Sequence, residues 1–219
     1  RPNNVAEEAK QRFDQGFTAV KMNATEELHY IDSYEKVDQV LERMNSIKEL
    51  LGNKIQVGID FHGRVHKPMA KILIKELEPF RPMFIEEPVL PENWDAIIDT
   101  AKNSPIPIAT GERLSTRWEF KRLFNNNSVD IIQPDVALAG GILETRKIAA
   151  AAEMYAMAVA THAPYGPVAL AATLQLDMCT PNVFIQEQSL GIHYNKGFDL
   201  IDFVKNKEIF MFKDGYLDV

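Results

Sequence analysis

The chain has little cysteine, no long apolar run and no excess of positive charge. Its one cysteine, Cys179, excludes an internal disulfide and is typical of a reducing compartment. No apolar run approaches the roughly 18 residues that a membrane-spanning helix needs. We also find no secretory signal, and we therefore expect a soluble, cytoplasmic protein.

The formal net charge is −7, which argues against nucleic acid or an anionic membrane as the main partner. An anionic substrate remains open, because the charge at a local site can differ from the total. The chain also lacks an internal linker or low-complexity segment. With 219 residues, of which 46% are hydrophobic, it can bury one sizeable core.

Short apolar runs rich in β-branched residues recur along the chain, and each ends on an acid or a histidine. The clearest run, Ile55 to Ile59, ends on Asp60, and His62 follows two residues later. Runs of this kind predict buried strands. The runs end, 23 to 27 residues apart, on Asp60, Glu86, Glu112, Asp135, His162 and Glu187.

Apolar residues at helical spacing fill the intervals between these runs, most clearly from Tyr34 to Leu51. Strands that alternate with helices predict a parallel α/β sheet. With an earlier strand from Phe17 to Met22, we count seven strands whose polar ends meet at one edge. That count favours a TIM-like (β/α) barrel over an open doubly wound sheet. Since such a barrel needs eight strands, we expect the first strand to lie upstream, in a longer protein.

Three local patterns add detail to this architecture. Thr116 and Glu119 have the spacing of a capping box at the start of a helix. The last strand is expected from Val183 to Glu187. Residues 209–219 are expected to form a strand pair around Asp214-Gly215.

Asp60, Glu86 and Glu112 end three successive strands, so we expect their carboxylates to converge at one edge. Three like charges in a dry site are unfavourable unless a cation offsets them. Mg²⁺ fits, because it accepts a few carboxylates and keeps positions for water or substrate. Alternatively, each acid is a solvated loop residue or a helix cap, which is a weaker explanation for three acids at equal spacing. Glu87 is left out, because the next residue along a strand points to the other face.

Asp135 and His162 end the following two strands. An Asp beside a His holds one tautomer and raises its basicity, as in a general base, whereas a buried structural pair is the competing interpretation. His62 would share the face of Asp60, as a second acid/base or a fourth ligand. Glu187 either hydrogen-bonds substrate or an intermediate, or belongs to a plain polar loop.

Two polar residues end the first visible strand. Lys21 can stabilise negative charge. Asn23 can bind substrate but cannot abstract a proton. For the remaining histidines, His29, His66 and His193, we expect surface or structural roles.

Taken together, these motifs resemble the enolase superfamily, in its mandelate-racemase-like group, over nearly the whole chain. The sequences of these motifs are most similar to those of the D-galactonate dehydratase family. The motifs that carry the resemblance are Asp60-Phe61-His62-Gly63-Arg64, Ile85-Glu86-Glu87-Pro88-Val89, Gly111-Glu112-Arg113, Gln133-Pro134-Asp135, His162-Ala163-Pro164, Gln186-Glu187-Gln188 and Gly191-Ile192-His193-Tyr194-Asn195.

The resemblance implies a modified enolase-type barrel, (β/α)₇β, with Mg²⁺ and an acid-sugar substrate. It also implies a capping domain before the barrel, so residues 1–198 would be the barrel and 199–219 a segment that returns toward the cap. The residues similar to the metal ligands are Asp60, Glu86 and Glu112. His162, backed by Asp135, resembles the base, His62 the acid, and Glu187 the residue that stabilises the enediolate.

One departure from the racemases bears on the reaction. They carry Lys-x-Lys at the end of the first visible strand, and their second lysine is a base on the opposite face. This chain has Lys21 and then Asn23, which disfavours two-base racemisation and leaves one-sided elimination.

The resemblance therefore predicts a lyase that dehydrates a D-galactonate-like sugar acid to a 2-keto-3-deoxy acid. The alternatives are another sugar acid, such as gluconate or mannonate, or a fragment without turnover. The resemblance also predicts a homo-oligomer. Candidates for its apolar contacts are Trp94, Trp118, Phe210 and Phe212.

Overall fold

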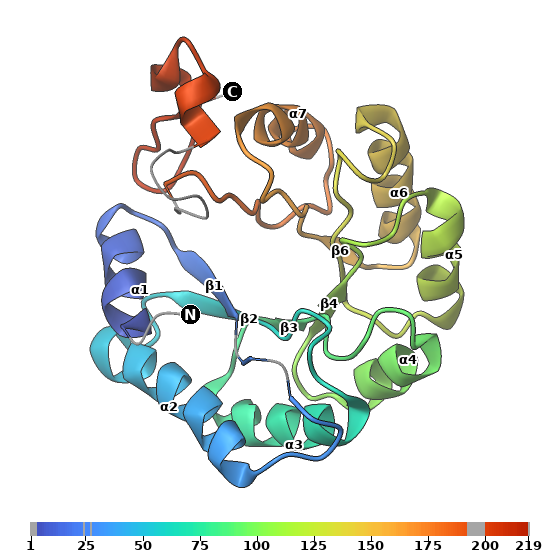
Figure 1. Ribbon diagram of the computed structural model, residues 1–219. Helices are drawn as coiled ribbons and strands as arrows, with labels where there is room; N and C mark the ends of the chain where they lie inside the picture. Colours follow the sequence, from blue (N-terminus) through green and yellow to red (C-terminus); the bar gives the residue numbers. More distant parts are fainter. Residues whose placement is uncertain (1–3, 24, 27, 192–199, 219) are drawn as a thin grey trace. The chain divides into compact units, whose positions relative to one another are not determined.

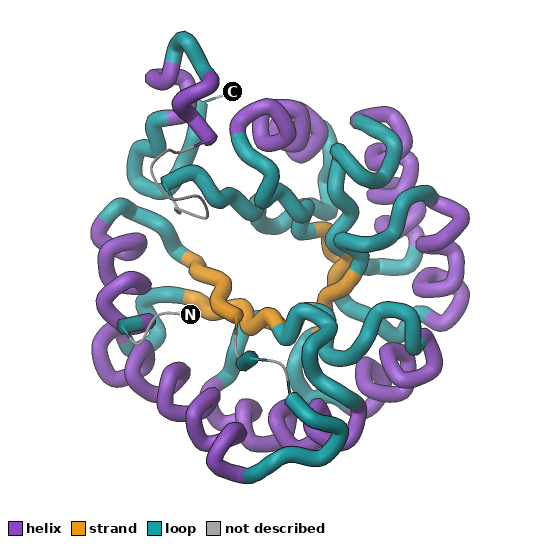
Figure 2. The backbone as a smooth tube through the Cα atoms, viewed as in Figure 1, coloured by secondary structure: helices purple, strands orange, loops and turns teal. Residues whose placement is uncertain are grey.

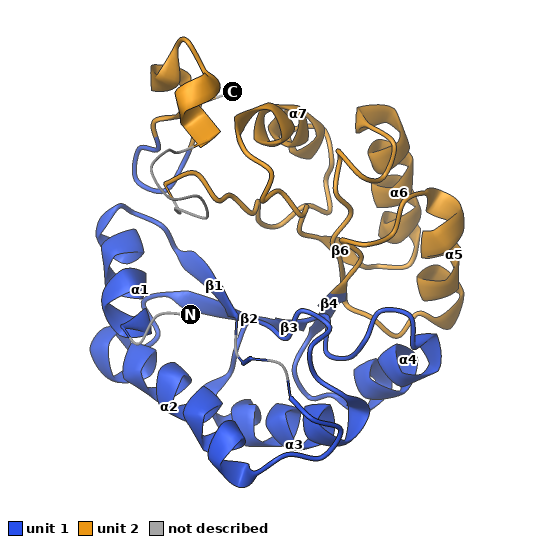
Figure 3. Cartoon of the chain, in the orientation of Figure 1, with its two compact units in different colours: residues 1–109, 212–216 blue, residues 110–211, 217–219 orange. Residues whose placement is uncertain are grey.

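A computed structural model describes residues 4–23, 25, 26, 28–191 and 200–218 (Figure 1). The chain divides into two compact units, and each is described by itself (Figure 3). Unit 1 comprises residues 1–109 and 212–216, and unit 2 comprises residues 110–211 and 217–219. The predicted domain boundary at residue 198 lies outside the described residues.

The described residues of unit 1 form four α-helices, one before its first strand and three between its strands. They are α1 (Val5–Asp14), α2 (Tyr34–Leu51), α3 (Lys67–Leu77), which continues into the 3-10 helix η1 (Glu78–Phe80), and α4 (Trp94–Asn103). In α2 the residues at helical spacing, Val37, Val40, Met44, Ile47 and Leu51, are all buried. The predicted amphipathic helix is therefore confirmed with its bounds. The helices follow one another along one side of the strands (Figure 2).

The strands of unit 1 are β1 (Ala19–Asn23), β2 (Gln56–Asp60), β3 (Phe84–Glu86) and the first part of β4 (Ile108–Thr110). Neighbouring strands pair in parallel. The register places Asn23 beside Asp60, and Asp60 beside Glu86. In a parallel sheet the strands end at the same edge, so this register brings two predicted metal ligands next to each other.

Unit 2 starts within β4 and repeats the alternation. Its elements are α5 (Arg117–Asn126), β5 (Ile131–Ile132), α6 (Ile142–Met154), β6 (Ala158–Val159), α7 (Pro167–Asp177) and the 3-10 helices η2 (Leu200–Phe203) and η3 (Lys207–Phe210). Strands β5 and β6 pair in parallel. The Gln133 N–H donates to the carbonyl of Thr110 at 2.9 Å, which ties the residue after β5 to the end of β4.

The predicted last strand is shorter in the structure than the sequence indicates. Only Val183 pairs, through a single parallel bridge to Val159. Beyond it, the Gln186 side chain donates to the carbonyls of Thr161 and Glu187 at 3.3 and 2.6 Å. Side-chain hydrogen bonds thus replace the backbone ladder after Val183.

The capping box predicted at Thr116 is wrong in its partners. The Thr116 side chain makes no capping hydrogen bond. The Glu119 carboxylate accepts from the backbone N–H of Ser115 at 2.6 Å, and Glu144 of α6 accepts from that of Arg117 at 3.1 Å. A tertiary contact therefore satisfies a helix N-terminus that the local motif was expected to cap.

The C-terminal strand pair is also shorter than predicted. Residues 207–210 form the 3-10 helix η3, and of the residues described up to 218 only Lys213 and Tyr216 pair across Asp214-Gly215. This turn lies against the N-terminal part of unit 1, where the rings of Phe17 and Phe212 are 5.3 Å apart.

Within the described part of the chain, no helix combines the length and apolar character needed to cross a membrane.

Gly16 permits the close approach of the C-terminal turn. It has φ +91°, and an added Cβ would overlap the backbone of Asp214. Gly16→Ala should therefore lower the free energy of unfolding by about 3 kcal/mol or more. Gly141 is a matched control, because it has φ +88° but nothing within 4 Å of an added Cβ. Gly141→Ala should lose only the roughly 1–3 kcal/mol of a positive-φ backbone that favours glycine. Equal losses in urea denaturation would contradict the role of the close approach.

Candidate active site

Glu86, at the end of β3, is paired with Lys21 of β1. The Lys21 ammonium donates to both carboxylate oxygens of Glu86 at 2.8 Å. Glu86 is fully buried, while about a quarter of the Lys21 side chain is exposed. A buried carboxylate needs such compensation, and the bidentate contact supplies part of it. The structure therefore brings together two of the predicted site residues.

Asp60, at the end of β2, is held by His62. Its Oδ1 accepts from the backbone N–H of His62 at 2.6 Å, and its Oδ2 lies 3.1 Å from the imidazole Nδ1. Burial raises the pKa of Asp60, and the nearby charge of Glu86 adds to this, although the hydrogen bond from His62 and the charge of Lys21 act in the opposite direction. Two adjacent buried carboxyls thus disfavour each other's ionisation.

The contact between His62 and Asp60 depends on a turn after β2 and not on the alternation of side chains along a strand. Strand β2 ends at Asp60, and His62 has φ 53°, in the left-handed region. This turn folds the imidazole back onto the carboxylate two residues earlier. Glu87 similarly follows the end of β3, is buried and has φ 39°. Strand alternation therefore gives no reason to exclude Glu87 from the site. Asn23, the register neighbour of Asp60, is exposed at the end of β1.

His162 and Asp135 form the central pair of unit 2. They face each other across a parallel bridge, with His162 Nδ1 2.7 Å from Asp135 Oδ2. The other oxygen, Asp135 Oδ1, accepts from the backbone N–H groups of Ala137 and Leu138 at 2.7 and 3.2 Å. Both side chains of the pair are buried. Because a carboxylate only accepts hydrogen bonds, this contact places the proton of the neutral imidazole on Nδ1.

The second imidazole nitrogen faces another predicted site residue. His162 Nε2 lies 3.5 Å from Oε2 of Glu112, which is buried just beyond β4. Glu187 joins the same group, since its Oε2 accepts from the backbone N–H of Ala163 at 2.9 Å. Unit 2 therefore brings together Glu112, Asp135, His162 and Glu187.

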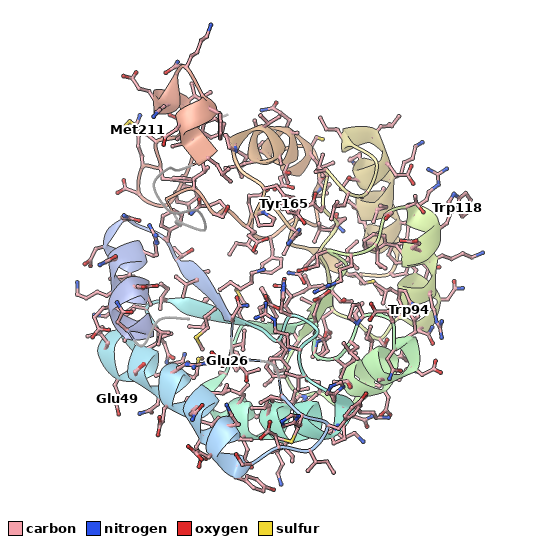
Figure 4. All side chains as sticks on the ribbon, in the orientation of Figure 1. Glu26, Glu49, Trp94, Trp118, Tyr165 and Met211 are labelled. Atoms are coloured by element: carbon pink, nitrogen blue, oxygen red, sulfur yellow. The ribbon has the colours of Figure 1, made fainter. Side chains whose placement is uncertain are left out.

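Tyr165 is a neighbour of His162 that the sequence analysis did not single out. Its ring meets the imidazole edge-on, with centroids 5.7 Å apart and planes at 82° (labelled in Figure 4). Burial raises the pKa of Tyr165, and the negative charges of Asp135, Glu112 and Glu187 add to this, whereas Arg113 acts in the opposite direction. The only sequence feature that could have indicated Tyr165 as a site residue is its position three residues after His162.

The predicted site residues thus form two clusters, one in each unit. The unit 1 cluster contains Lys21, Asn23, Asp60, His62 and Glu86. The unit 2 cluster contains Glu112, Asp135, His162 and Glu187. In both, a histidine is bonded to an aspartate, and carboxyls are buried at strand ends.

The chain is similar in sequence and in structure to known proteins. The chain is 51% identical to D-galactonate dehydratase from Pectobacterium atrosepticum over 216 residues. The aligned region covers 99% of this chain and 56% of that protein. A member of the enolase superfamily from Salmonella Typhimurium superposes with a TM-score of 0.80 at 26% identity, over 84% of this chain and 50% of that one.

A mandelate racemase/muconate lactonizing enzyme-like protein from Rubrobacter xylanophilus gives a TM-score of 0.78 at 29% identity, over 83% of this chain and 48% of that one. The chain therefore spans about half the length of the relatives it matches. A family model described as enolase C-terminal domain-like matches residues 4–219. The fold and superfamily predicted from the motifs are confirmed, and the chain belongs to the enolase C-terminal domain-like family.

Proposed function

We propose that this chain carries the acid/base and metal-binding residues of a dehydratase for a D-galactonate-like sugar acid. The single observation that carries the proposal is the buried His162–Asp135 pair, with its 2.7 Å contact just beyond β5 and β6. The identity of 51% with D-galactonate dehydratase over 99% of the chain supports the substrate class. The reaction is abstraction of the proton α to the carboxylate, followed by loss of the 3-hydroxyl.

The donor set fits Mg²⁺. Asp60, Glu86 and Glu112 offer carboxylate oxygens, the ligands that Mg²⁺ prefers, and they are only 5%, 0% and 6% exposed. The raised pKa of Asp60 reflects the unfavourable burial of negative charge, which a cation would relieve. We assign these three residues as the ligands. When bound, Mg²⁺ would supply stabilisation of the negative charge that develops on the substrate carboxylate.

His162 is the proposed base. Asp135 holds the proton on Nδ1, so the lone pair on Nε2 is available to accept the α-proton. Once the imidazole is protonated, Asp135 and Glu112 lie on either side of the new positive charge. Electrostatic stabilisation of this kind lowers the barrier to proton abstraction.

His62 is the proposed acid. Asp60 contacts its Nδ1, which leaves Nε2 to donate a proton to the departing hydroxyl. Lys21 and Glu187 are proposed to bind the substrate and to stabilise the enediolate, and Asn23 to bind a substrate hydroxyl. The enol then tautomerises to the 2-keto-3-deoxy acid. Asn23 cannot act as a base, so the chemistry stays on one face of the substrate.

The ligand assignment predicts that Glu86→Gln and Glu112→Gln lose Mg²⁺ binding while the protein stays folded. Each variant should weaken binding by more than the roughly 10–100-fold that loss of an outer-shell partner causes. Isothermal titration calorimetry with MgCl₂ measures the affinity, and circular dichroism checks the fold. Glu153→Gln is a matched control on the exposed part of α6, and it should bind Mg²⁺ normally. Wild-type affinity in either site variant would refute the ligand set.

The two histidine roles predict different isotope patterns. His162→Asn should abolish both dehydration and exchange of the substrate α-proton with solvent deuterium, because no base remains. His62→Asn should slow product formation by on the order of 10²- to 10⁴-fold but still allow exchange. The recovered substrate should be deuterated with unchanged configuration, since Asn23 offers no base on the other face.

Proton NMR in D₂O with galactonate, gluconate and mannonate measures these outcomes and also ranks the candidate substrates. His29→Asn is the control, because His29 is exposed and lies outside both clusters. Exchange by His162→Asn, or epimerised substrate from His62→Asn, would overturn the roles. No turnover of any sugar acid by the wild-type protein would instead favour the fragment without activity.

We also propose that the protein self-associates, with Trp118 as the apolar contact. Trp118 projects from α5 (Figure 4) and is 68% exposed. Phe210 is buried and Phe212 packs on Phe17, so neither is available for such a contact. Trp118→Arg should shift sedimentation toward smaller species at micromolar concentration. Identical sedimentation of wild type and variant would rule out this contact.

A further inference from the structure

Three side chains next to the unit 2 cluster form a hydrogen-bonded chain that the proposed reaction does not use. Thr161, directly before His162, is fully buried. Its hydroxyl lies 3.2 and 3.1 Å from Oδ1 and Oδ2 of Asp177, the last residue of α7. The same hydroxyl lies 3.0 Å from Oε1 of Gln186. We call Asp177, Thr161 and Gln186 the Thr161 chain.

The count of protons in the Thr161 chain indicates that Asp177 is a neutral acid. One hydroxyl proton faces three acceptor oxygens, two on Asp177 and one on Gln186. If Asp177 is ionised, either its carboxylate or the Gln186 amide oxygen lacks this donor. If Asp177 is protonated, its O–H donates to Thr161 Oγ1, and the Thr161 hydroxyl donates to Gln186 Oε1. The protonated form therefore supplies a donor both between Asp177 and Thr161 and between Thr161 and Gln186, which the ionised form cannot do.

The surroundings of Asp177 agree with this assignment. Burial raises the pKa of Asp177 to about 7, and only the hydrogen bond from Thr161 opposes the shift. None of the described charged or titratable groups on the adjoining elements contributes. These groups are Glu144, Arg146, Lys147 and Glu153 on α6, His162 after β6, and Glu187.

The Thr161 chain joins the two segments that carry His162 and Glu187. Besides accepting from Thr161, Gln186 donates through Nε2 to the backbone carbonyls of Thr161 and Glu187. Glu187 in turn accepts from the backbone N–H of Ala163. The backbone pairing of these segments ends at the Val159–Val183 bridge. Beyond that bridge, side-chain hydrogen bonds hold the segments together.

We propose that Asp177 is a positioning residue: as a neutral acid, it completes the Thr161 chain and so holds His162 and Glu187 in their places. The inference rests on the proposed function of His162 as the base. Ionisation of Asp177 removes the donor from one end of the chain, so the two segments are held less tightly. The arrangement thus makes the proposed site sensitive to pH through a residue that touches neither substrate nor metal.

Three substitutions separate the role of the Thr161 chain from that of the charge on Asp177. Asp177→Asn keeps a donor at every pH, because its amide N–H can donate to Thr161. The decline of wild-type kcat between pH 6 and 8.5 that ionisation of Asp177 causes, with a midpoint near 7, should be absent in this variant. Thr161→Val breaks the chain without changing charge and should lower kcat at least about tenfold at all pH values, with little change in KM. Thr161→Ser restores the hydroxyl and should restore kcat.

Unfolding gives a readout that needs no substrate. The folded-state pKa of Asp177 is about 7, above the roughly 3.9 of an unfolded aspartate. The stability contributed by the bound proton is therefore complete below the unfolded value and is lost as pH rises through 7. Each pH unit between these values should lower the folding equilibrium constant up to about tenfold. Asp177→Asn should remove this decline, whereas Asp130→Asn, a control at an exposed acid, should keep it.

NMR of the substrate-free protein distinguishes failure of this inference from failure of the proposed function. The Ala163 amide proton and the His162 ring nitrogens should shift with a midpoint near pH 7 in the wild type, and that component should vanish in Asp177→Asn. If both proteins titrate alike at these resonances, the positioning role is overturned even if sugar acids are turned over. If the resonances differ as expected but no sugar acid reacts, the inference stands and the proposed reaction fails. If Thr161→Val does not fold, Thr161→Ser and Asp177→Asn still decide between these outcomes.

Discussion

Buried carboxyl groups at the ends of parallel strands are the constraint on which this structure depends. Burial of an unpaired charge is strongly unfavourable, so each such group needs a partner or a proton. Glu86 has Lys21, and Asp135 has His162 and two backbone N–H groups. Asp177 is a half-buried acid at the end of α7, and in our proposal it holds a proton. These three forms of compensation place a cation, an imidazole and a neutral acid beside the residues that we propose for catalysis.

The same constraint links stability with chemistry. Asp60 and Glu86 are register neighbours, and the charge of one opposes ionisation of the other. Two adjacent buried carboxylates repel each other unless positive charge lies nearby. Binding of a metal cation would therefore stabilise the folded site. In unit 2 the imidazole of His162 lies between the carboxylates of Asp135 and Glu112. Both carboxylates therefore lie beside the positive charge that the proposed base acquires during proton abstraction.

Sequence patterns predicted the elements better than their ends. The alternation of helices and strands and the bounds of α2 follow from apolar periodicity, which reports burial directly. The last strand, the capping box and the C-terminal strand pair were wrong in detail. In the first two, a contact from elsewhere took the place of the local pattern: Gln186 bonds the backbone after Val183, and Glu144 caps α5. In the third, the 3-10 helix η3 replaces part of the expected strand.

The sequence alone identifies which acids and histidines lie at or just beyond the strand ends, because the β-branched apolar runs that precede them are local signals. It also determined that Asn23 replaces the second lysine of the racemases. The partners of these residues follow only from the packed fold: the left-handed turn at His62, the contact of Lys21 with Glu86, and the Thr161 chain. These contacts join residues far apart in the chain or depend on one backbone dihedral angle. No periodicity encodes them, because they arise only when the elements pack and exclude water from their polar groups.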